Sequence, residues 1–185
     1  DDESVREQVE TVYDAADRLL ALSERARHVD RTLAAVDRGR ADLDELAALA
    51  VADFERTHAD IAVTVEAAPA GTVVADGAAR VVLRELLSVV ADRSDDASVT
   101  VTLGRDAEHG QATVEVAADE PFVLETTRAA LSKGTEQSLQ HAAGLGMWVA
   151  QWVTESMNGA LLIPGSGPSD RVRFTVPTVS GDGDR

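Results

Sequence analysis

The segment Gly144-Leu145-Gly146-Met147-Trp148 decides the fold that we expect for this chain. Two glycines one residue apart at the start of a helix allow backbone N–H groups to approach an anion closely. A Gly-x-Gly pair alone is a weak signal. Here a polar run from Leu131 to His141 precedes it, and an amphipathic helix through Met157 and then Asn158-Gly159 follow. The segment predicts an anion-binding loop, and a tight loop-to-helix junction without a ligand is the alternative.

Composition limits the classes of protein that this chain can belong to. Its 185 residues are enough for one sizeable domain with an appended segment, and with 3% aromatic residues its core must consist of Ala, Val and Leu. The net charge of -16 repels phosphate backbones and anionic lipid, so we expect no nucleic-acid partner and no direct membrane contact. The single lysine, Lys133, among many acidic residues resembles haloarchaeal proteins adapted to high salt. An acidic protein from a GC-rich genome is the alternative.

The absence of cysteine excludes disulfides and thiolate metal sites and favours the cytoplasm. No apolar run reaches membrane-spanning length and no signal peptide is visible. The chain begins Asp1-Asp2-Glu3 without Met, so we expect a piece of a longer protein with a sensor region upstream. The histidines show no metal-ligand spacing, and no metal site is predicted from His28, His58, His109 and His141.

Apolar residues recur at spacings of three and four from Ser4 to Arg38 and predict one long helix that ends at Gly39-Arg40. A rod with a narrow apolar seam needs a partner helix. We therefore expect either a homodimer through residues 4–38 or pairing with upstream sequence. The predicted organisation is a long helix over residues 1–40, a domain over residues 41–179 and a disordered tail over residues 180–185.

Hydrophobic periodicity after residue 41 alternates between helical and extended patterns. A mixed sheet with helices on one face follows from the element order, so the predicted fold class is α+β, a two-layer α/β sandwich. The expected elements are a helix from Asp42 or Asp44 to about Arg56, strands near 61–65 and 73–74, a helix over 77–93 capped by Asp76, strands at 98–103 and 112–116, a short helix near 124–131, a helix to Met157, and strands at 160–163 and 171–176.

This element order and the glycine pair resemble the histidine-kinase-type ATP-binding domain, called GHKL, Bergerat fold or HATPase_c, over residues 14 to 177. The stretch from Ala15 to Arg27 is similar to the second helix of the dimerisation hairpin in haloarchaeal sensor kinases. The resemblance implies the C-terminal part of a two-component sensor histidine kinase, with ATP and Mg²⁺ as cofactors of active members and a response regulator as partner. The phosphoacceptor histidine of the family lies on a helix upstream, so His28 is not expected to be the acceptor.

In active members, the helix after the second strand carries an Asn that helps to hold the magnesium ion bridging the ATP phosphates. The matching stretch runs from Glu85 to Arg93, and Val89 stands at the Asn position. Valine offers no oxygen to a cation that requires oxygen ligands. Glu85 matches a position that can carry a base, although we favour a Glu that faces solvent. Arg93 replaces the family's His, and we favour a surface position for it over contact with a phosphate.

The first glycine box of the family reads Asp-x-Gly-x-Gly, and its Asp accepts a hydrogen bond from the adenine amine. Here Ala118 stands at the Asp position, and Glu120 and Phe122 stand at the glycine positions. Asp119 is one residue late, and a shift of one residue turns a strand side chain to the opposite face. Asp119 would substitute only if a bulge re-aimed it. We expect Phe122 to fill the mouth of the pocket.

The last glycine box is intact, with residues 133–141 as the lid that the resemblance implies. Glu85 is the one candidate for a vestigial catalytic base, and no metal ligand is predicted. If nucleotide binds at all, the matching positions are Val89, Arg93, Ala118, Asp119, His141, Gly144, Leu145 and Gly146.

Three hypotheses for function follow. We favour a degenerate kinase domain, a pseudokinase that acts as a dimerising signalling scaffold without a cofactor, because two boxes have lost polar groups together. The second hypothesis is an active histidine kinase domain that transfers the γ-phosphate of ATP to a histidine outside this chain. The third is an interaction module that binds a different small molecule in the emptied pocket.

Overall fold

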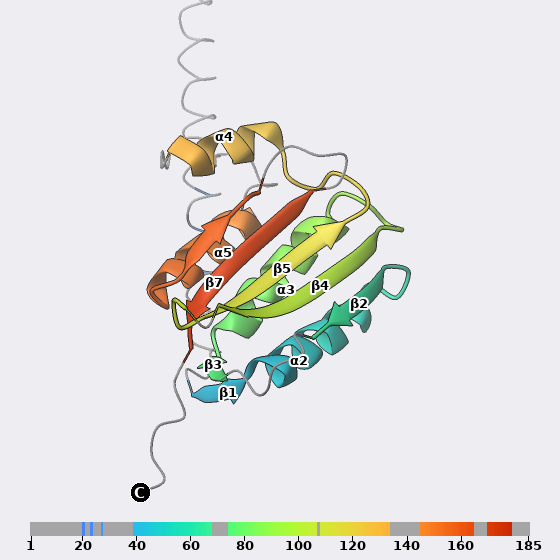
Figure 1. The fold of residues 1–185 in the computed structure, drawn as a ribbon. Coiled ribbons are helices and arrows are strands. Elements are labelled where there is room, and N and C mark those ends of the chain that lie inside the picture. The colour runs from blue at the N-terminus through green and yellow to red at the C-terminus, as the bar shows by residue number, and fades with distance from the viewer. Residues whose placement is uncertain are drawn as a thin grey trace, which may run out of the picture.

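The computed structural model describes residues 20, 23, 27, 39–67, 74–106, 108–133, 145–164 and 170–178. These residues form a mixed α+β domain, which confirms the predicted fold class (Figure 1). In chain order the elements are β1 (Arg40–Asp42), α2 (Leu43–Glu55), β2 (Ala62–Glu66), β3 (Val74–Asp76), α3 (Ala79–Ala91), β4 (Ser98–Asp106), β5 (Gln111–Ala118), α4 (Glu125–Lys133), α5 (Leu145–Ser156), β6 (Ala160–Leu162) and β7 (Arg171–Pro177).

The main sheet has five strands in the order β2-β4-β5-β7-β6. β2 runs parallel to β4, and every other neighbouring pair in this sheet is antiparallel. Residues of β5 alternate between buried and half-buried because successive side chains point to opposite faces of a strand. A separate two-stranded ladder joins β1 and β3 antiparallel, with Arg40 opposite Asp76.

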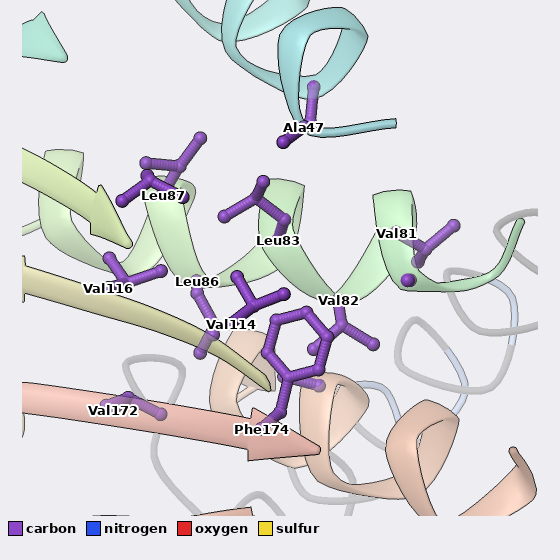
Figure 2. Packing of buried hydrophobic residues seen from close by; sticks show 14 of the residues in the cluster. Ala47, Val81, Val82, Leu83, Leu86, Leu87, Val114, Val116, Val172 and Phe174 are labelled. Atoms are coloured by element: carbon purple, nitrogen blue, oxygen red, sulfur yellow. The ribbon is translucent and has the colours of Figure 1, made fainter. Parts of the chain in front are cut away.

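Helices α2, α3 and α5 cover one face of the main sheet (Figure 1). The core lies between these two layers and consists mainly of Val, Leu and Ala. Figure 2 shows the ring of Phe174 from β7 among Val82 and Leu86 of α3 and Val114 of β5. Phe174, Val82 and Leu86 are completely buried. Burial of such aliphatic side chains is the dominant favourable term in folding.

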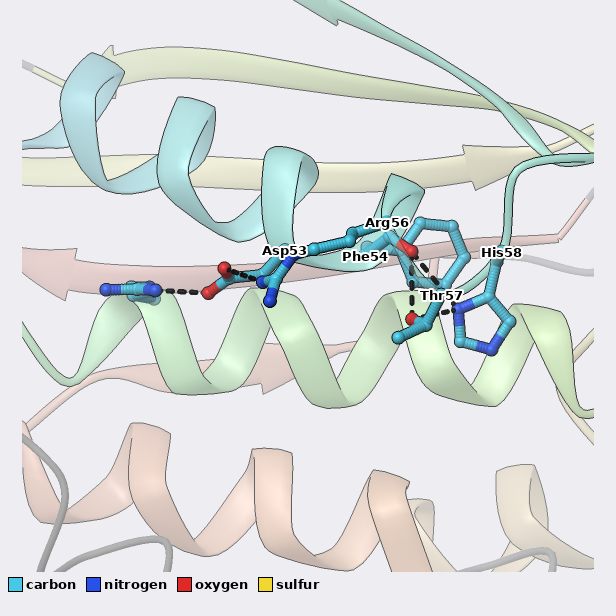
Figure 3. A network of polar contacts seen from close by, with 6 residues as sticks. Asp53, Phe54, Arg56, Thr57 and His58 are labelled. Atoms are coloured by element: carbon cyan, nitrogen blue, oxygen red, sulfur yellow. Dashed lines mark hydrogen bonds and ion pairs between the residues drawn. The ribbon is translucent and has the colours of Figure 1, made fainter.

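Asp53 of α2 is joined to α3 by Arg80 and also pairs with Arg56 at the end of its own helix (Figure 3). Its carboxylate accepts hydrogen bonds from Arg80 at the start of α3 and, at 2.5 Å, from Arg56 of its own helical region. Behind this network, the ring of Phe54 stacks on His58 with centroids 4.4 Å apart. The Asp53–Arg80 pair adds a polar link to the packing of α2 on α3, the helix that carries two of the candidate site residues.

Most predicted elements are confirmed. Of the two capping residues left open for α2, Asp42 is the N-cap, because its Oδ1 accepts a hydrogen bond from the backbone N–H of Asp44 at 2.9 Å. The prediction that Asp76 caps α3 is wrong. Asp76 is the last residue of β3. The N-cap of α3 is Ala78, whose methyl side chain cannot accept a hydrogen bond.

Leu20, Ser23 and Arg27 are helical. The rest of residues 1–38 and the tail over residues 180–185 lie outside the described residues, so the long helix, the dimer and the disordered tail stay predictions. Among the residues that the structure describes, none of the helices combines the length and apolar character that spanning a bilayer requires.

Candidate functional site

The candidate site lies where the start of α5 meets α3, because Gly146 packs directly on the helix that carries Glu85 and Val89. A Cβ atom built on Gly146 would lie 2.7 Å from Val89 Cγ2 and 3.3 Å from the Glu85 backbone carbonyl oxygen. Contacts between carbon atoms are favourable only beyond about 3.5 Å. Glycine is therefore required here by the close approach of the two helices. Val89 is 4% exposed, so its side chain belongs to the helix interface.

Glu85 lies one turn before Val89 on the same face of α3, and it is buried rather than exposed. Its residue exposure is 6%, so our interpretation of a solvent-facing Glu is wrong. The physical reason is that α5 covers this face of α3, which a single-helix pattern does not reveal. Arg84 Nη2 donates to Glu85 Oε1 at 3.2 Å. Glu85 Oε2 would lie 3.8 Å from a Cβ atom on Gly146, so the carboxylate faces the start of α5.

Arg93 lies one turn beyond Val89 and is exposed. It follows Asp92, the C-cap of α3, and its backbone N–H donates to the Val90 carbonyl at 2.9 Å. The helix has therefore ended before Arg93, and the choice between a surface role and contact with a phosphate stays a prediction.

The segment after β5, which matches the first glycine box, is fastened to the neighbouring strand by Asp119. The Asp119 backbone N–H donates to the Ser98 carbonyl at 3.2 Å, and the Ser98 N–H donates to Asp119 Oδ1 at 2.9 Å. This reciprocal pair extends the β4–β5 ladder by one position beyond Ala118, which is opposite Val99. The Asp119 carboxylate therefore caps the start of β4.

Two apolar side chains of the same segment are buried. Ala118 is 3% exposed and Phe122 is 2% exposed. Phe122 belongs to the main hydrophobic core together with Val123. The phenyl ring is therefore packed inside the domain, in agreement with the expectation that it fills space rather than lining an open pocket.

Asp170 forms a second attachment of this segment, and sequence reasoning missed it. Its Oδ2 accepts a hydrogen bond from the Val123 backbone N–H at 2.6 Å, and its Oδ1 accepts one from Arg128 Nη2 at 2.7 Å. Its own carbonyl oxygen accepts from the Ala118 N–H at 3.2 Å. Asp170 is 6% exposed. No spacing in the sequence signals the pair, because its members stand on α4 and just before β7.

The remaining predicted positions are only partly described. Leu145 is the first residue of α5, and Lys133 is the last residue of α4. His141 and Gly144 lie outside the described residues, as does the rest of the expected lid. Within the described part of the chain, no group of three or more His, Asp or Glu side chains is placed to hold a metal ion.

No protein-family model and no curated protein matches this sequence. Solved structures with a similar fold do exist. The mycobacterial sensor histidine kinase MprB superposes with a TM-score of 0.60 at 18% identity, over 76% of this chain and 98% of that chain. The histidine kinase domain of the E. coli osmosensor EnvZ gives a TM-score of 0.56 at 18% identity, over 80% of this chain and 93% of that chain.

A longer protein matches over more of the chain. Full-length ShkA, solved in complex with AMPPNP, gives a TM-score of 0.67 at 22% identity, over 96% of this chain. The match spans 40% of that protein, so its remaining parts have no counterpart here. At these identities the similarity shows the fold. The chain therefore has the fold of histidine kinase catalytic domains, as the resemblance of its sequence implied.

Proposed function

We propose that this chain is the kinase-like domain of a two-component sensor protein and that its nucleotide site is closed. It acts as a dimerising scaffold in signalling and holds neither ATP nor Mg²⁺ tightly. The observation that carries this proposal is the contact of Val89 with the start of α5 at Gly146. The fold supports a kinase-like signalling role, and the side chains at the matching positions support inactivity.

The donor set at the magnesium position argues against a bound cation. Mg²⁺ requires oxygen ligands in near-octahedral geometry. Val89 presents two methyl groups, and one of them lies 2.7 Å from the place that a Gly146 Cβ atom would take. A methyl group in that position excludes a hydrated ion from the gap between α3 and the start of α5. Glu85 is the one carboxylate on this face, and Arg84 donates to it.

The adenine position has also lost its acceptor. Ala118 has no polar side chain, and the carboxylate of Asp119 is committed to the Ser98 N–H. No bulge interrupts the β4–β5 register, which pairs each residue from Val99 to Asp106 with one from Gln111 to Ala118. Asp119 is therefore not re-aimed in the way that substitution would require. Phe122 is buried where active members carry glycine.

Loss of these groups is sufficient to abolish phosphoryl transfer. That reaction depends on positioning of the phosphates and on neutralisation of their charge by the metal ion. A domain that neither positions the phosphates nor holds the metal ion can still present its surface to other proteins. We propose a cytoplasmic homodimer through residues 4–38, an upstream sensor region in the same protein and a response regulator as partner.

The experiment that tests the proposal is a titration with Mg-ATP in several molar KCl, by calorimetry and by thermal unfolding. A ligand at a concentration of 100 times its Kd stabilises the folded state by about 2.7 kcal/mol. With 1 mM Mg-ATP, a Kd of about 10 μM would therefore give that stabilisation. We expect no measurable heat and no shift in Tm. Micromolar binding would overturn the proposal.

An active kinase domain remains the second candidate, because Glu85 is buried and faces the start of α5. A buried carboxylate beside the last glycine box is what a vestigial or working base would need. This alternative predicts that the full-length parent autophosphorylates. No such activity is expected if the nucleotide site is closed.

A further inference from the structure

We propose that Asp170, Arg128 and the Val123 backbone N–H form a latch that holds α4 and the loop after β5 shut. This inference rests on the proposed function, since it concerns the regulation of the same closed site. The latch is an autoinhibitory contact, because it keeps Phe122 packed in the core at the position where active members of the fold family carry a glycine.

One carboxylate joins two points of this segment, in addition to the burial of Phe122 in the core. Asp170 Oδ1 is 2.7 Å from Arg128 Nη2 on α4, and Asp170 Oδ2 is 2.6 Å from the Val123 backbone nitrogen in the loop. Hydrogen bonds to an ionised group are shorter and stronger than neutral ones. One side chain thus holds two points of the segment, one in the loop and one in the first turns of α4.

Burial makes the Asp170 carboxylate sensitive to the loss of Arg128. Asp170 is 6% exposed, and the Arg128 side chain is 19% exposed. Removal of one partner from a buried ion pair leaves the other charge desolvated and without compensation. The exposed Glu125 carboxylate, 3.7 Å from Arg128 Nε, is a weaker partner because water and salt screen it.

Of the α4 side chains that the structure describes, Glu125 and Thr126 are exposed and Thr127 is buried. α4 lies off the end of the sandwich (Figure 1). Thr127 is 5% exposed and is its buried contact beside Arg128. Elements at the edge of a domain can open locally while the core stays folded, so we expect the ion pair to contribute to keeping α4 closed.

Asp119 defines where the moving segment begins. Its reciprocal hydrogen bonds with Ser98 continue the strand ladder, so the chain up to Asp119 stays with the sheet. Opening therefore involves the residues from Glu120 onward. It breaks the Val123 hydrogen bond, withdraws Phe122 from the core and frees α4.

The test is hydrogen exchange, followed by mass spectrometry, on the 185-residue chain and two latch variants in the same high-salt buffer. Asp170→Asn keeps an oxygen for the Val123 N–H but removes the charge that holds Arg128. Arg128→Met keeps the length and apolar stem of the side chain but removes the guanidinium. In both variants we expect exchange of residues 120–128 to accelerate by at least about tenfold, with the strand residues of β4 and β5 unchanged.

Glu115→Gln is the matched control. Glu115 accepts from Arg173 Nη2 at 2.6 Å, but the Arg173 side chain is 46% exposed and the two residues lie on strands that backbone hydrogen bonds already join. This variant should leave exchange of residues 120–128 as in the wild type. Should Asp170→Asn fail to fold, Arg128→Met alone decides the result.

Unchanged exchange over residues 120–128 in the folded latch variants would overturn the latch. Acceleration spread equally over β4 and β5 would also overturn it, because the pair would then support the whole domain. The closed nucleotide site fails on a separate measurement, namely micromolar binding of Mg-ATP by the wild type. Each inference can therefore fail while the other stands.

Discussion

Gly146 on α5 lies so close to Val89 on α3 that a methyl group at Gly146 would come within 2.7 Å of Val89 Cγ2. The two residues match different motifs in the resemblance that the sequence suggests, and in this chain the backbone at Gly146 lies against the Val89 side chain. A glycine that serves an anion and a glycine that admits a neighbouring helix look alike in a sequence. Here the second requirement is sufficient to explain Gly146.

Gly146→Ala should destabilise the domain whether or not a nucleotide binds. The new Cβ atom would overlap Val89 Cγ2, and the Glu85 carbonyl oxygen at 3.3 Å is backbone that yields little. Overpacking of this kind costs about 1–3 kcal/mol. Urea unfolding in high salt, with constant m-value, measures the loss.

A second substitution checks the cause of that loss. Val89→Ala removes the methyl group that the Gly146→Ala side chain meets, so the double variant should lose less stability than the sum of the two single variants. Residues in contact typically show coupling of about 0.5–3 kcal/mol. Additive losses of unfolding free energy would show that the side chains at the two positions do not contact each other.

Val89→Asn introduces the residue type that the resemblance to active kinase domains implies at this position, and we expect it to destabilise this domain without creating a magnesium site. Val89 is 4% exposed and belongs to the hydrophobic core, so an amide placed there is taken out of water. A buried polar group without a hydrogen bond costs about 1–3 kcal/mol. Unfolding free energies with and without Mg-ATP measure both parts of the prediction.

Val89→Thr is the control for size. Threonine matches the shape of valine, and its hydroxyl can donate to the carbonyl four residues earlier in the helix, so the loss should be smaller than for asparagine. Stabilisation of Val89→Asn by Mg-ATP would contradict the prediction, because it would show that one side chain alone had closed the site.

The strand alternation and helical periodicity were sufficient to predict the sandwich, because its core is apolar and its faces are regular. The short strand β1 was missed because Arg40-Ala41-Asp42 is too short and too polar for an alternating pattern. It exists because β3 pairs with it. The N-cap of α3 was predicted wrongly because Asp76 is the last residue of β3, where it pairs with Arg40 of β1.

Only those features of the candidate site that depend on neighbouring residues in the sequence could be predicted. Glycine and polar positions could be placed on helices and loops, and the burial of Phe122 followed from its size. Glu85 was interpreted wrongly because the helix that covers it lies 60 residues later in the chain. The Asp170–Arg128 pair was missed because 42 residues separate its members and only the fold brings them together.

Asp119→Ala should weaken the start of β4. The substitution leaves the Ser98 N–H without its acceptor at 2.9 Å, and loss of one such hydrogen bond costs about 1 kcal/mol. Asp119→Asn keeps an oxygen acceptor and should retain most of the stability. Exchange of the Ser98 amide, together with unfolding free energies, measures the effect.

The same variant separates two roles for Asp119. If the carboxylate bound adenine instead, Asp119→Ala would abolish binding of Mg-ATP and leave the Ser98 amide as protected as before. That pattern would refute the capping role and favour an active kinase domain.

The ion pairs of Asp53 with Arg80 and Arg56 should make the free energy of unfolding depend on pH in the acid range. The hydrogen bond from Arg80 lowers the pKa of the Asp53 carboxyl below its ordinary value of 3.8, partial desolvation opposes this effect, and the charges of Arg80 and Arg56 add to the lowering (Figure 3). Because the unfolded chain binds this proton more readily, the stabilisation is complete above 3.8 and is lost as the pH falls through the lower pKa of the folded state. The difference in unfolding free energy between wild type and Asp53→Asn should therefore shrink towards acid pH.

Arg80→Gln and Arg56→Gln test which arginine is responsible. The hydrogen bond from Arg80 is the largest cause of the lowered pKa, so Arg80→Gln should remove more of the pH dependence than Arg56→Gln. The carboxyl of Asp106, whose pKa the backbone N–H of His109 lowers, titrates in every variant and cancels in the comparison. The difference in unfolding free energy between wild type and Asp53→Asn could instead stay constant from neutral pH to below 3.8. That result would show that the charge of Asp53 does not stabilise the fold. α2 would then be attached to α3 by packing alone.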